Sequence, residues 1–400
     1  MDAAPDRKRW GILALLFFSI AINLLDRQVL AVLAPTIRDE LKLSNTEYSY
    51  IVTCFLIGLT LAQVPSGMWI DRAGPRLGLP VLMVIWSIAN GLHSIARSVA
   101  QLSVFRFLLG VGECGNYSAG VKVISQWFPA KERALAGGIF NSGTVIGAFF
   151  APYLIVKLSA TFGWRMAFVV PSVLGLLWIV PWLLWYRDKQ TSASTTVQQA
   201  AIGPLLKMRQ VWGAVMIRAL AGPVVHFYWY WLPEYLKRER HFSMEMIGLY
   251  AGIPFLFAGL GNLAGGWFSG YLIGRGVPID SARKIAFGLC AALCLISTAV
   301  PLAPGEVSAM ALICLATFAL GASVANHIGL LTDLFSPPVL ARLTGLTGMC
   351  EGVVNITVTL ATGIIVDKFG YLPIFIAVGL MPAIAISGLF LLIRRVERIG

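Results

Sequence analysis

Asp26 and Arg27 stand side by side inside a segment that is otherwise almost wholly apolar. The chain reads WGILALLFFSIAINLL before them and VLAVLA after Gln28. An ionised residue at the centre of a bilayer helix costs about 2.5–3.5 kcal/mol on insertion scales, so such residues mark functional sites. Neighbours on a helix point about 100° apart. We therefore expect Asp26 and Arg27 to face different partners, with Asn23 one turn before Arg27 on the same face.

Arg106 and Glu113, within residues 101–124, form a second set of charges in an apolar segment. A spacing of seven places them on nearly one helix face but about 10.5 Å apart along the axis, so both need partners from other helices. Asp26 is the candidate partner for Arg106, which leaves Glu113 in a glycine-rich stretch without a fixed cation. A mid-membrane carboxyl that ionises and reprotonates is a proton carrier. The alternative is a structural ion-pair network.

The second half of the chain also has polar residues inside apolar segments. Thr347, Glu351, Asn355 and Thr359 repeat every four residues, His327 follows Asn326 within 307–334, and His226 precedes FYWYW. A lone residue such as His226 is more often a satisfied core group, whereas a whole stripe is harder to explain that way. Glu351 would repel a bare anion, so we expect it to be protonated, to be paired, for instance with His327, or to meet a positive ligand group. Lys122 and Arg218, near helix ends, are explained by snorkelling.

The charged and polar residues above can form a membrane site only if the apolar segments around them are membrane-spanning helices. The composition of the chain predicts such helices. Of the 400 residues, 58% are hydrophobic and 12% are charged, with a mean hydropathy of +0.78, whereas a soluble domain is about 25% charged. A hydrocarbon core near 30 Å thick needs about 20 apolar residues per helix. Twelve segments meet this need, at residues 10–33, 47–70, 77–96, 101–124, 134–157, 164–186, 208–236, 244–274, 281–302, 307–334, 341–366 and 370–394.

The net charge of +12 reflects orientation in the membrane rather than a nucleic-acid partner. With the N-terminus in the cytoplasm, the 31 Lys and Arg residues divide into eighteen on the cytoplasmic side, nine outside and four within segments. That excess matches the positive-inside rule. We expect a multi-pass protein of the cell membrane with both termini cytoplasmic. The first segment is too long for a signal peptide and is retained as a span.

Several motifs are set aside. GVGECG at 110–115 matches a dinucleotide-binding pattern but lies inside an apolar segment without a preceding strand, so it predicts close helix packing. The chain has no Walker A motif, no HExxH and no metal-ligand spacing of Cys and His. Its six cysteines lie inside predicted helices and are expected to be free. We expect no enzyme activity, no cofactor and no metal, and a proton gradient as the energy source.

The chain is predicted to consist of two similar halves. Residues 187–210 are rich in Ser, Thr and Gln with basic ends, which is typical of a linker. Pro129 to Arg133 before one segment resembles Pro338 to Arg342 before another, and a Gly follows each Arg by ten residues. We expect two six-helix bundles, residues 1–186 and 211–400, joined by a cytoplasmic linker at 187–210.

Longer stretches resemble a known family. GMWIDRAGPR at 67–76 resembles the loop signature of the major facilitator superfamily. NLLDR, RFLLGVGE and KVISQWFPAKERALAGGIFNSGTVIGAFFAP are similar to the anion:cation symporter family within it, nearest to bacterial proton-coupled hexuronate and galactonate transporters. The resemblance implies an all-α fold of twelve transmembrane helices. It also implies that Asp26 and Glu113 carry coupling protons, that Arg27 binds the substrate carboxylate and that Arg106 couples the two processes.

The expected function is proton-coupled import of an organic anion, such as a sugar acid, by alternating access with the site between the halves. The candidate substrate-binding residues are Arg27, Asn23, Tyr117, His226, Glu351, Asn355 and His327. Leu24 and Leu59 replace tyrosines of the sugar-acid branch, which weighs against a hydroxyl-rich substrate. The alternatives are an exporter or exchanger of small organic acids, disfavoured because Gly147 is not followed by proline, and a transporter-like receptor. We expect a monomer whose partners are the anion, protons and membrane lipid.

Overall fold

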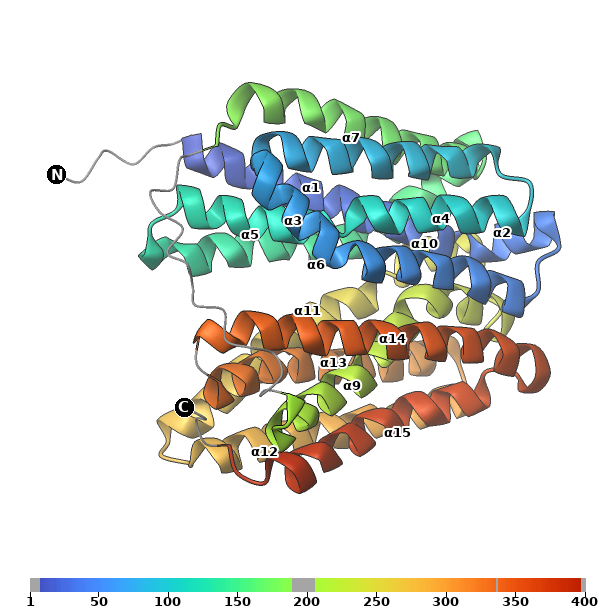
Figure 1. Ribbon diagram of the computed structural model, residues 1–400. Helices are drawn as coiled ribbons and strands as arrows, with labels where there is room; N and C mark the ends of the chain where they lie inside the picture. Colours follow the sequence, from blue (N-terminus) through green and yellow to red (C-terminus); the bar gives the residue numbers. More distant parts are fainter. Residues whose placement is uncertain (1–7, 189–205, 336, 397–400) are drawn as a thin grey trace. The chain divides into compact units, whose positions relative to one another are not determined.

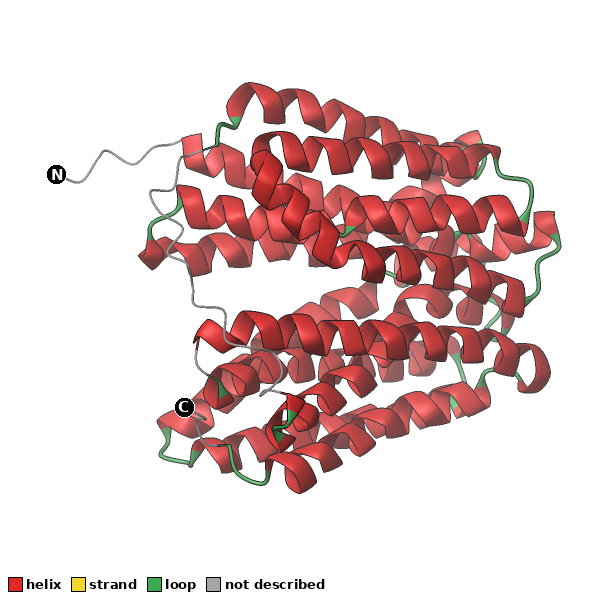
Figure 2. Cartoon of the chain, viewed as in Figure 1, coloured by secondary structure: helices red, strands yellow, loops and turns green. Residues whose placement is uncertain are grey.

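The regular elements of the structure, a computed structural model, are helices joined by short loops (Figures 1 and 2). The structure describes residues 8–188, 206–335 and 337–396. The helices up to residue 188 are α1 (Lys8–Val32), α2 (Ala34–Leu41), α3 (Asn45–Leu92), η1 (His93–Ile95), α4 (Val99–Glu113), α5 (Gly115–Trp127), α6 (Ala130–Phe162) and α7 (Met166–Trp185). Those that follow are α9 (Arg209–Arg238), α10 (Met244–Tyr250), α11 (Ile253–Gly274), α12 (Ile279–Cys294), η2 (Leu295–Leu302), α13 (Glu306–Leu334), α14 (Pro337–Phe369), α15 (Leu372–Gly388) and η3 (Leu389–Ile393).

The helices account for twelve membrane spans. Ten helical segments of the described residues are long and apolar enough to cross a membrane. One of them, Asn45–Ile95, has 51 residues and contains two spans, because the backbone leaves helical geometry at Gly74, with φ of +72°. Helices α4 and α5 meet at Cys114, and although each is too short alone, together they make one more span. The predicted twelve-helix, all-α fold is therefore confirmed.

The chain separates into two compact units. The first comprises Met1–Ala193 and Pro233–Gly252, and the second comprises Ser194–Leu232 and Ile253–Gly400. Most of the predicted linker, at 189–205, lies outside the described residues, and the predicted boundaries at 186 and 211 stay predictions. The last turns of α9 and the whole of α10 pack with the first unit.

Glycines allow α3 and α4 to pack backbone against backbone. A Cβ added to Gly110 would lie 2.3 Å from the carbonyl oxygen of Phe55, and one added to Gly112 would lie 2.6 Å from the amide nitrogen of Trp86. A Cβ added to Gly58, on α3, would likewise lie 2.3 Å from the carbonyl oxygen of Phe107. Such distances are too short for any larger residue. Close helix packing, the predicted role of GVGECG, is confirmed.

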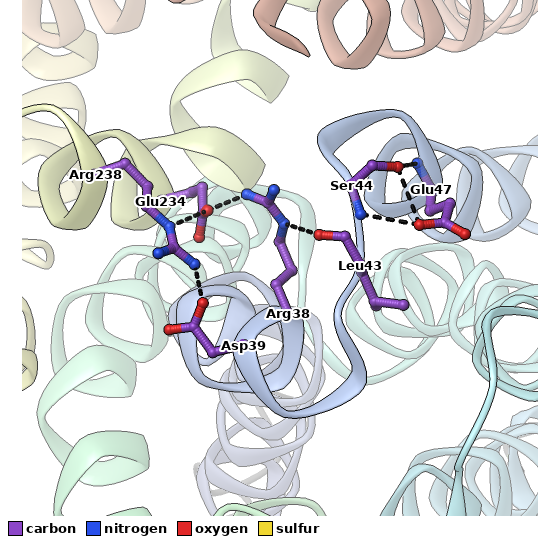
Figure 3. Close-up of polar contacts among 7 residues, drawn as sticks. All are labelled: Arg38, Asp39, Leu43, Ser44, Glu47, Glu234 and Arg238. Carbon is purple, nitrogen blue, oxygen red and sulfur yellow. Dashed lines mark hydrogen bonds and ion pairs between the residues drawn. The ribbon is translucent and has the colours of Figure 1, made fainter.

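A buried ion-pair network holds the end of α9 to α2 within the first unit (Figure 3). Arg38 of α2 donates to Glu234 of α9 and, through Nε, to the carbonyl oxygen of Leu43 at 3.1 Å. Arg238 donates from Nε to the same Glu234 oxygen at 3.1 Å and pairs with Asp39. The Glu234 side chain is fully buried. This network was not predicted from the sequence.

The loop at 67–76 forms a charged clamp whose cation comes from α5. Lys122 donates from Nζ to Asp71 Oδ1 at 2.8 Å and to the carbonyl oxygen of Ile70 at 3.1 Å. Gly74 makes the turn, and Asp188 accepts a hydrogen bond from the amide of Arg76 at 3.3 Å. The Lys122 ammonium thus has an acid partner that is 75% exposed, and its snorkelling role stays a prediction.

The second unit makes a clamp of its own from other residues. Arg283 of α12 donates from Nε to Asp333 of α13 at 2.8 Å. Its Nη1 also reaches Ser269 of α11 at 3.1 Å and Asn326 of α13 at 3.2 Å. One guanidinium thus ties α11, α12 and α13 together.

Candidate functional site

Arg27 and Glu113 form an ion pair within the first unit. The distance from Arg27 Nε on α1 to Glu113 Oε2 at the end of α4 is 2.5 Å. The Glu113 side chain is fully buried, whereas the Arg27 side chain is 19% exposed. The prediction that Glu113 lacks a fixed cation is wrong. The seven-residue spacing of Arg106 and Glu113 sets their positions on one helix only, whereas the cation that pairs with Glu113 is Arg27 of α1.

Asp26 faces a different partner from its neighbour, as predicted from the helix angle. Its Oδ1 accepts a hydrogen bond from Asn90 Nδ2 of α3 at 2.7 Å, while Asp26 Oδ2 is buried and has no hydrogen-bond partner within the described residues. Asn90 Nδ2 also lies 3.2 Å from the carbonyl oxygen of Phe168 and 3.3 Å from Ser172 Oγ on α7. Asn90 was missed by sequence reasoning. The sequence signal that could have indicated Asn90 is an amide side chain within the apolar segment 77–96.

Arg106 and Arg27 share the ring of Phe55 on α3. Their guanidinium carbons lie 5.7 Å and 5.5 Å from its centre, which is within cation–π range. Arg106 Nη2 also lies 3.5 Å from the carbonyl oxygen of Arg27. Asp26 is close enough to Arg106 and Glu113 for their charges to interact, and the direct partnership of Asp26 with Arg106 stays a prediction. The four predicted charged residues of the first half therefore form one cluster.

The other first-half candidates differ in their surroundings. Asn23 is buried one turn before Arg27, and its Nδ2 has no hydrogen-bond partner within the described residues. Tyr117 of α5 is 53% exposed, with its ring 5.9 Å from that of Phe140. Leu24, which replaces a tyrosine of the resembling family, is buried and packs against α6 near Gly147.

Glu351 of α14 is paired with Arg218 of α9 in the second unit. Arg218 Nε lies 2.6 Å from Glu351 Oε2, and Nη1 donates to Thr347 Oγ1 and the carbonyl oxygen of Thr344, both at 3.2 Å. Of the alternatives raised for Glu351, pairing is the one found, with Arg218 in place of His327. The snorkelling role predicted for Arg218 is wrong, because its side chain turns to α14.

The structure brings two more second-half candidates together. The Asn355 amide nitrogen on α14 lies 3.2 Å from His226 Nδ1 on α9, which is also 2.9 Å from the carbonyl oxygen of Gly222. The rings of Trp229 and Tyr230 lie 6.1 Å and 5.9 Å from the His226 ring.

His327 of α13 is 7% exposed, and neither ring nitrogen has a hydrogen-bond partner in the described part of the chain. Within the same residues, no group of three or more His, Cys, Asp or Glu side chains could hold a metal ion. The described cysteines are free, as expected for Cys54, Cys114, Cys290, Cys294, Cys314 and Cys350.

Comparison with known families gives this arrangement its context. The sequence model of the Major Facilitator Superfamily matches residues 16–328, which is more than half of the chain. The chain belongs to the Major Facilitator Superfamily. It is therefore a multi-pass membrane transporter and not an enzyme.

The curated relatives include sugar-acid transporters, and the solved structures include transporters of the same fold. The chain is 31% identical to the hexuronate transporter of Escherichia coli (strain K12), with 92% of this chain and 90% of that protein covered. It is also 31% identical to a probable L-galactonate transporter of the same strain, with 88% and 82% covered. A bacterial homologue of the human lysosomal transporter Spinster, solved in an inward-facing, occupied conformation, matches with a TM-score of 0.84 and 19% identity, and 98% of both chains is covered. The last comparison supports the fold alone.

Proposed function

We propose that this protein is a proton-coupled symporter that imports an organic anion, such as a sugar acid, across the cell membrane by alternating access. Two relatives that are about one-third identical are named for hexuronate and L-galactonate, both of which carry a carboxylate. The observation that carries the proposal is the ion pair between partly exposed Arg27 and fully buried Glu113. Asp26, held by Asn90, is the second proposed proton site.

The proposed mechanism is a competition between two carboxylates for one arginine. Arg27 offers a charged fork suited to a carboxylate, but Glu113 already occupies its Nε at 2.5 Å. A substrate anion that takes this place would leave Glu113 ionised and unpaired in a buried position, which costs several kcal/mol. Protonation of Glu113 removes that cost. Substrate and proton therefore bind together, and the proton offsets the substrate's negative charge.

Arg106 has a positioning role in this scheme. Its guanidinium lies within cation–π range of the Phe55 ring, as does that of Arg27, and it reaches the Arg27 carbonyl oxygen. It is also close enough to Asp26 for their charges to interact. Movement of Arg27 toward the substrate would shift Arg106, and with it the contact of Arg106 with the Arg27 carbonyl and its charge interaction with Asp26. The protonation of Asp26 is thereby linked to that of Glu113.

Further substrate contacts are proposed within each unit. The candidates are Asn23, Tyr117, His226, Asn355, His327 and Glu351. The proposed working unit is a monomer made of bundles at 1–186 and 211–400 with a linker at 187–210. No cofactor is required, because the proton gradient supplies the energy.

Uptake of radiolabelled glucuronate into proteoliposomes tests the proposal. An inward proton gradient should drive accumulation by the wild type. Glu113→Gln should abolish accumulation but retain exchange, because the amide mimics the protonated acid, and Arg27→Gln should abolish both. Glu132→Gln is the control. It alters a carboxylate outside this cluster, which pairs with Arg9 at 2.9 Å, and it should leave uptake unchanged. Full pH-driven accumulation by Glu113→Gln would exclude Glu113 as the carrier, and binding without flux in the wild type would indicate a receptor.

The proposed orientation has a separate test in intact cells. Lys42, exposed after α2, and Arg187, exposed after α7, fall on opposite sides of the membrane if both termini are cytoplasmic. A cysteine at Lys42 should react with an impermeant thiol reagent, and a cysteine at Arg187 should not. Labelling of the Arg187 variant alone would invert the topology.

A further inference from the structure

Asn90 of α3 joins three helices of the first unit at one buried point. Its Nδ2 donates to Asp26 Oδ1 of α1 at 2.7 Å. The same nitrogen lies 3.2 Å from the carbonyl oxygen of Phe168 and 3.3 Å from Ser172 Oγ, both of α7. Asp26 and Asn90 are each fully buried. The amide therefore meets the second proposed proton site in the interior of the first unit.

The surroundings of Asn90 fix which end of its amide faces Asp26. A carboxylate and a backbone carbonyl are acceptors only, whereas an amide nitrogen carries two hydrogens to donate. Ser172 Oγ donates to the carbonyl oxygen of Phe168 at 2.7 Å, so toward Asn90 it is an acceptor as well. A flipped amide would place Asn90 Oδ1 against these acceptors with no hydrogen between them. The hydrogen-bond network thus assigns the nitrogen to this side.

Small residues bring α3 and α7 close together around Asn90. A Cβ added to Gly91 would lie 3.4 Å from Ser172 Oγ. A Cβ added to Gly175 of α7 would lie 2.3 Å from Ser87 Oγ of α3, which is too short for any larger residue. The position of Asn90 is therefore set by helix packing as well as by its hydrogen bonds.

Two acceptors at this contact lack a donor. Asp26 Oδ2 and Asn90 Oδ1 are buried, and neither has a hydrogen-bond partner within the described residues. Buried polar atoms without partners are rare in native structures. The two oxygens belong to side chains that already share one hydrogen bond, and the last torsion angle of Asp and Asn is soft. One proton placed between these oxygens would satisfy both.

The neighbouring titratable groups do not supply that donor. The charges that act on Asp26 come from Glu113 and Arg106 of α4. Helix α7 has no titratable side chain, and α6 has its charged side chains in its first turn and its last two turns. His93, three residues after Asn90, directs Nδ1 to a carbonyl oxygen of α3 at 2.8 Å. The simplest donor that satisfies both oxygens is a proton on Asp26 itself.

We propose that Asn90 is a positioning residue that receives the coupling proton of Asp26. The proton comes from water and binds Asp26 Oδ2, which then donates to Asn90 Oδ1, while Asn90 Nδ2 keeps its bond to Asp26 Oδ1. The two side chains form a cyclic acid–amide pair with two hydrogen bonds, and release of the proton to water restores the single bond. The inference rests on the proposed function and adds Asn90 to its proton-coupling residues.

The acid–amide pair gives Asp26 comparable hydrogen bonding in both protonation states. The ionised form has one charge-assisted hydrogen bond, which is about twice as strong as a neutral one. The protonated form has two neutral hydrogen bonds instead. A carboxyl that carries a proton must be able to hold it and to release it, and a partner that both donates and accepts supports each state. Leucine at this position would support neither.

Infrared difference spectroscopy of the full-length protein in lipid tests the inference. The side-chain carbonyl of asparagine is isotope-labelled, and spectra at acidic and alkaline pH are compared. When Asp26 takes up its proton, the Asn90 carbonyl gains a hydrogen bond, so its stretching band should shift to lower frequency. Asp26→Asn cannot take up the proton and should lose this shift. Asn116→Leu removes another buried amide of the first unit, which accepts from Ser19 at 3.0 Å; it is the matched control and should keep the shift.

The carboxyl band of protonated Asp26 is a second readout. In wild type it should lie at the low frequency of an acid that both donates and accepts a hydrogen bond. Asn90→Leu should move this band to higher frequency, and Asn90→Gln, which keeps the amide, should restore part of the difference. If Asn90→Leu does not fold, the labelled wild type and Asp26→Asn decide the question alone.

The outcomes separate this inference from the proposed function. An Asn90 carbonyl band that stays in place or moves to higher frequency while Asp26 takes up its proton would overturn the inference, and the proposed function would stand. Absence of an Asp26 carboxyl band at every pH, with uptake still driven by a proton gradient, would exclude both Asp26 as a proton site and the role of Asn90. If the bands shift as expected but no organic acid is taken up, the proposed function fails.

Discussion

Removal of the Glu234 carboxylate should destabilise the first unit strongly. Glu234 is fully buried at the end of α9 and accepts from Arg38 and Arg238 (Figure 3). Arg38 is 8% exposed, and in Glu234→Ala it would keep the Leu43 carbonyl as its recorded acceptor. Loss of one partner from a buried pair costs about 3–5 kcal/mol, because the remaining charge is left uncompensated.

The two arginines contribute unequally to this cost. The Arg238 side chain is 41% exposed, so its pairing adds at most about 1 kcal/mol. The main loss therefore comes from Arg38. For a unit of 150–250 residues, each kcal/mol shifts Tm by about 2–4 °C. Glu234→Ala should thus lower Tm by roughly 6–20 °C.

Thermal unfolding of the detergent-solubilised protein measures this effect. Asp39→Asn, at a 60% exposed acid that pairs with Arg238, is the control and should shift Tm by less than about 4 °C. Glu234→Leu combined with Arg38→Met removes both buried charges and should recover most of the loss. A Tm of Glu234→Ala within 2 °C of wild type would refute the reasoning, and so would a double variant as unstable as the single one.

Two further predictions concern helix packing and pH. Gly110→Ala should cost about 1–3 kcal/mol through overpacking against α3, whereas Gly138→Ala, where a Cβ meets nothing within 4 Å, should leave the Tm of the detergent-solubilised protein unchanged; equal losses would contradict the packing argument. Outside the spanning segments, a hydrogen bond from Trp164 Nε1 holds the pKa of Glu40 below its usual value. A lowered folded-state pKa stabilises above the unfolded pKa, about 4.3, and the benefit is lost as pH falls through the folded value. Glu40→Gln should therefore lower Tm at pH 7 and match wild type near pH 3, and a pH-independent difference would exclude this origin.

The sequence by itself determined the membrane class and the helix count. Runs of about 20 apolar residues can only be satisfied as helices in a bilayer, because each helix pairs its own backbone groups. The predicted segments 47–70 and 77–96 are the two parts of α3, and 101–124 is α4 with α5. The turn at Gly74 that divides α3 was less predictable, since it depends on a positive backbone angle, with φ of +72°, whereas Cys114 between α4 and α5 keeps helical backbone angles.

The sequence also determined which residues need partners, and the tertiary structure decided who those partners are. Helix geometry sets the angle between Asp26 and Arg27, so their divergence could be predicted from two adjacent letters. Which helix lies opposite each one depends on packing between segments far apart in the chain. Arg27 meets Glu113 across 86 residues, and Arg218 meets Glu351 across 133. A charge inside a membrane must find a countercharge, but only the packed bundle places that countercharge within reach.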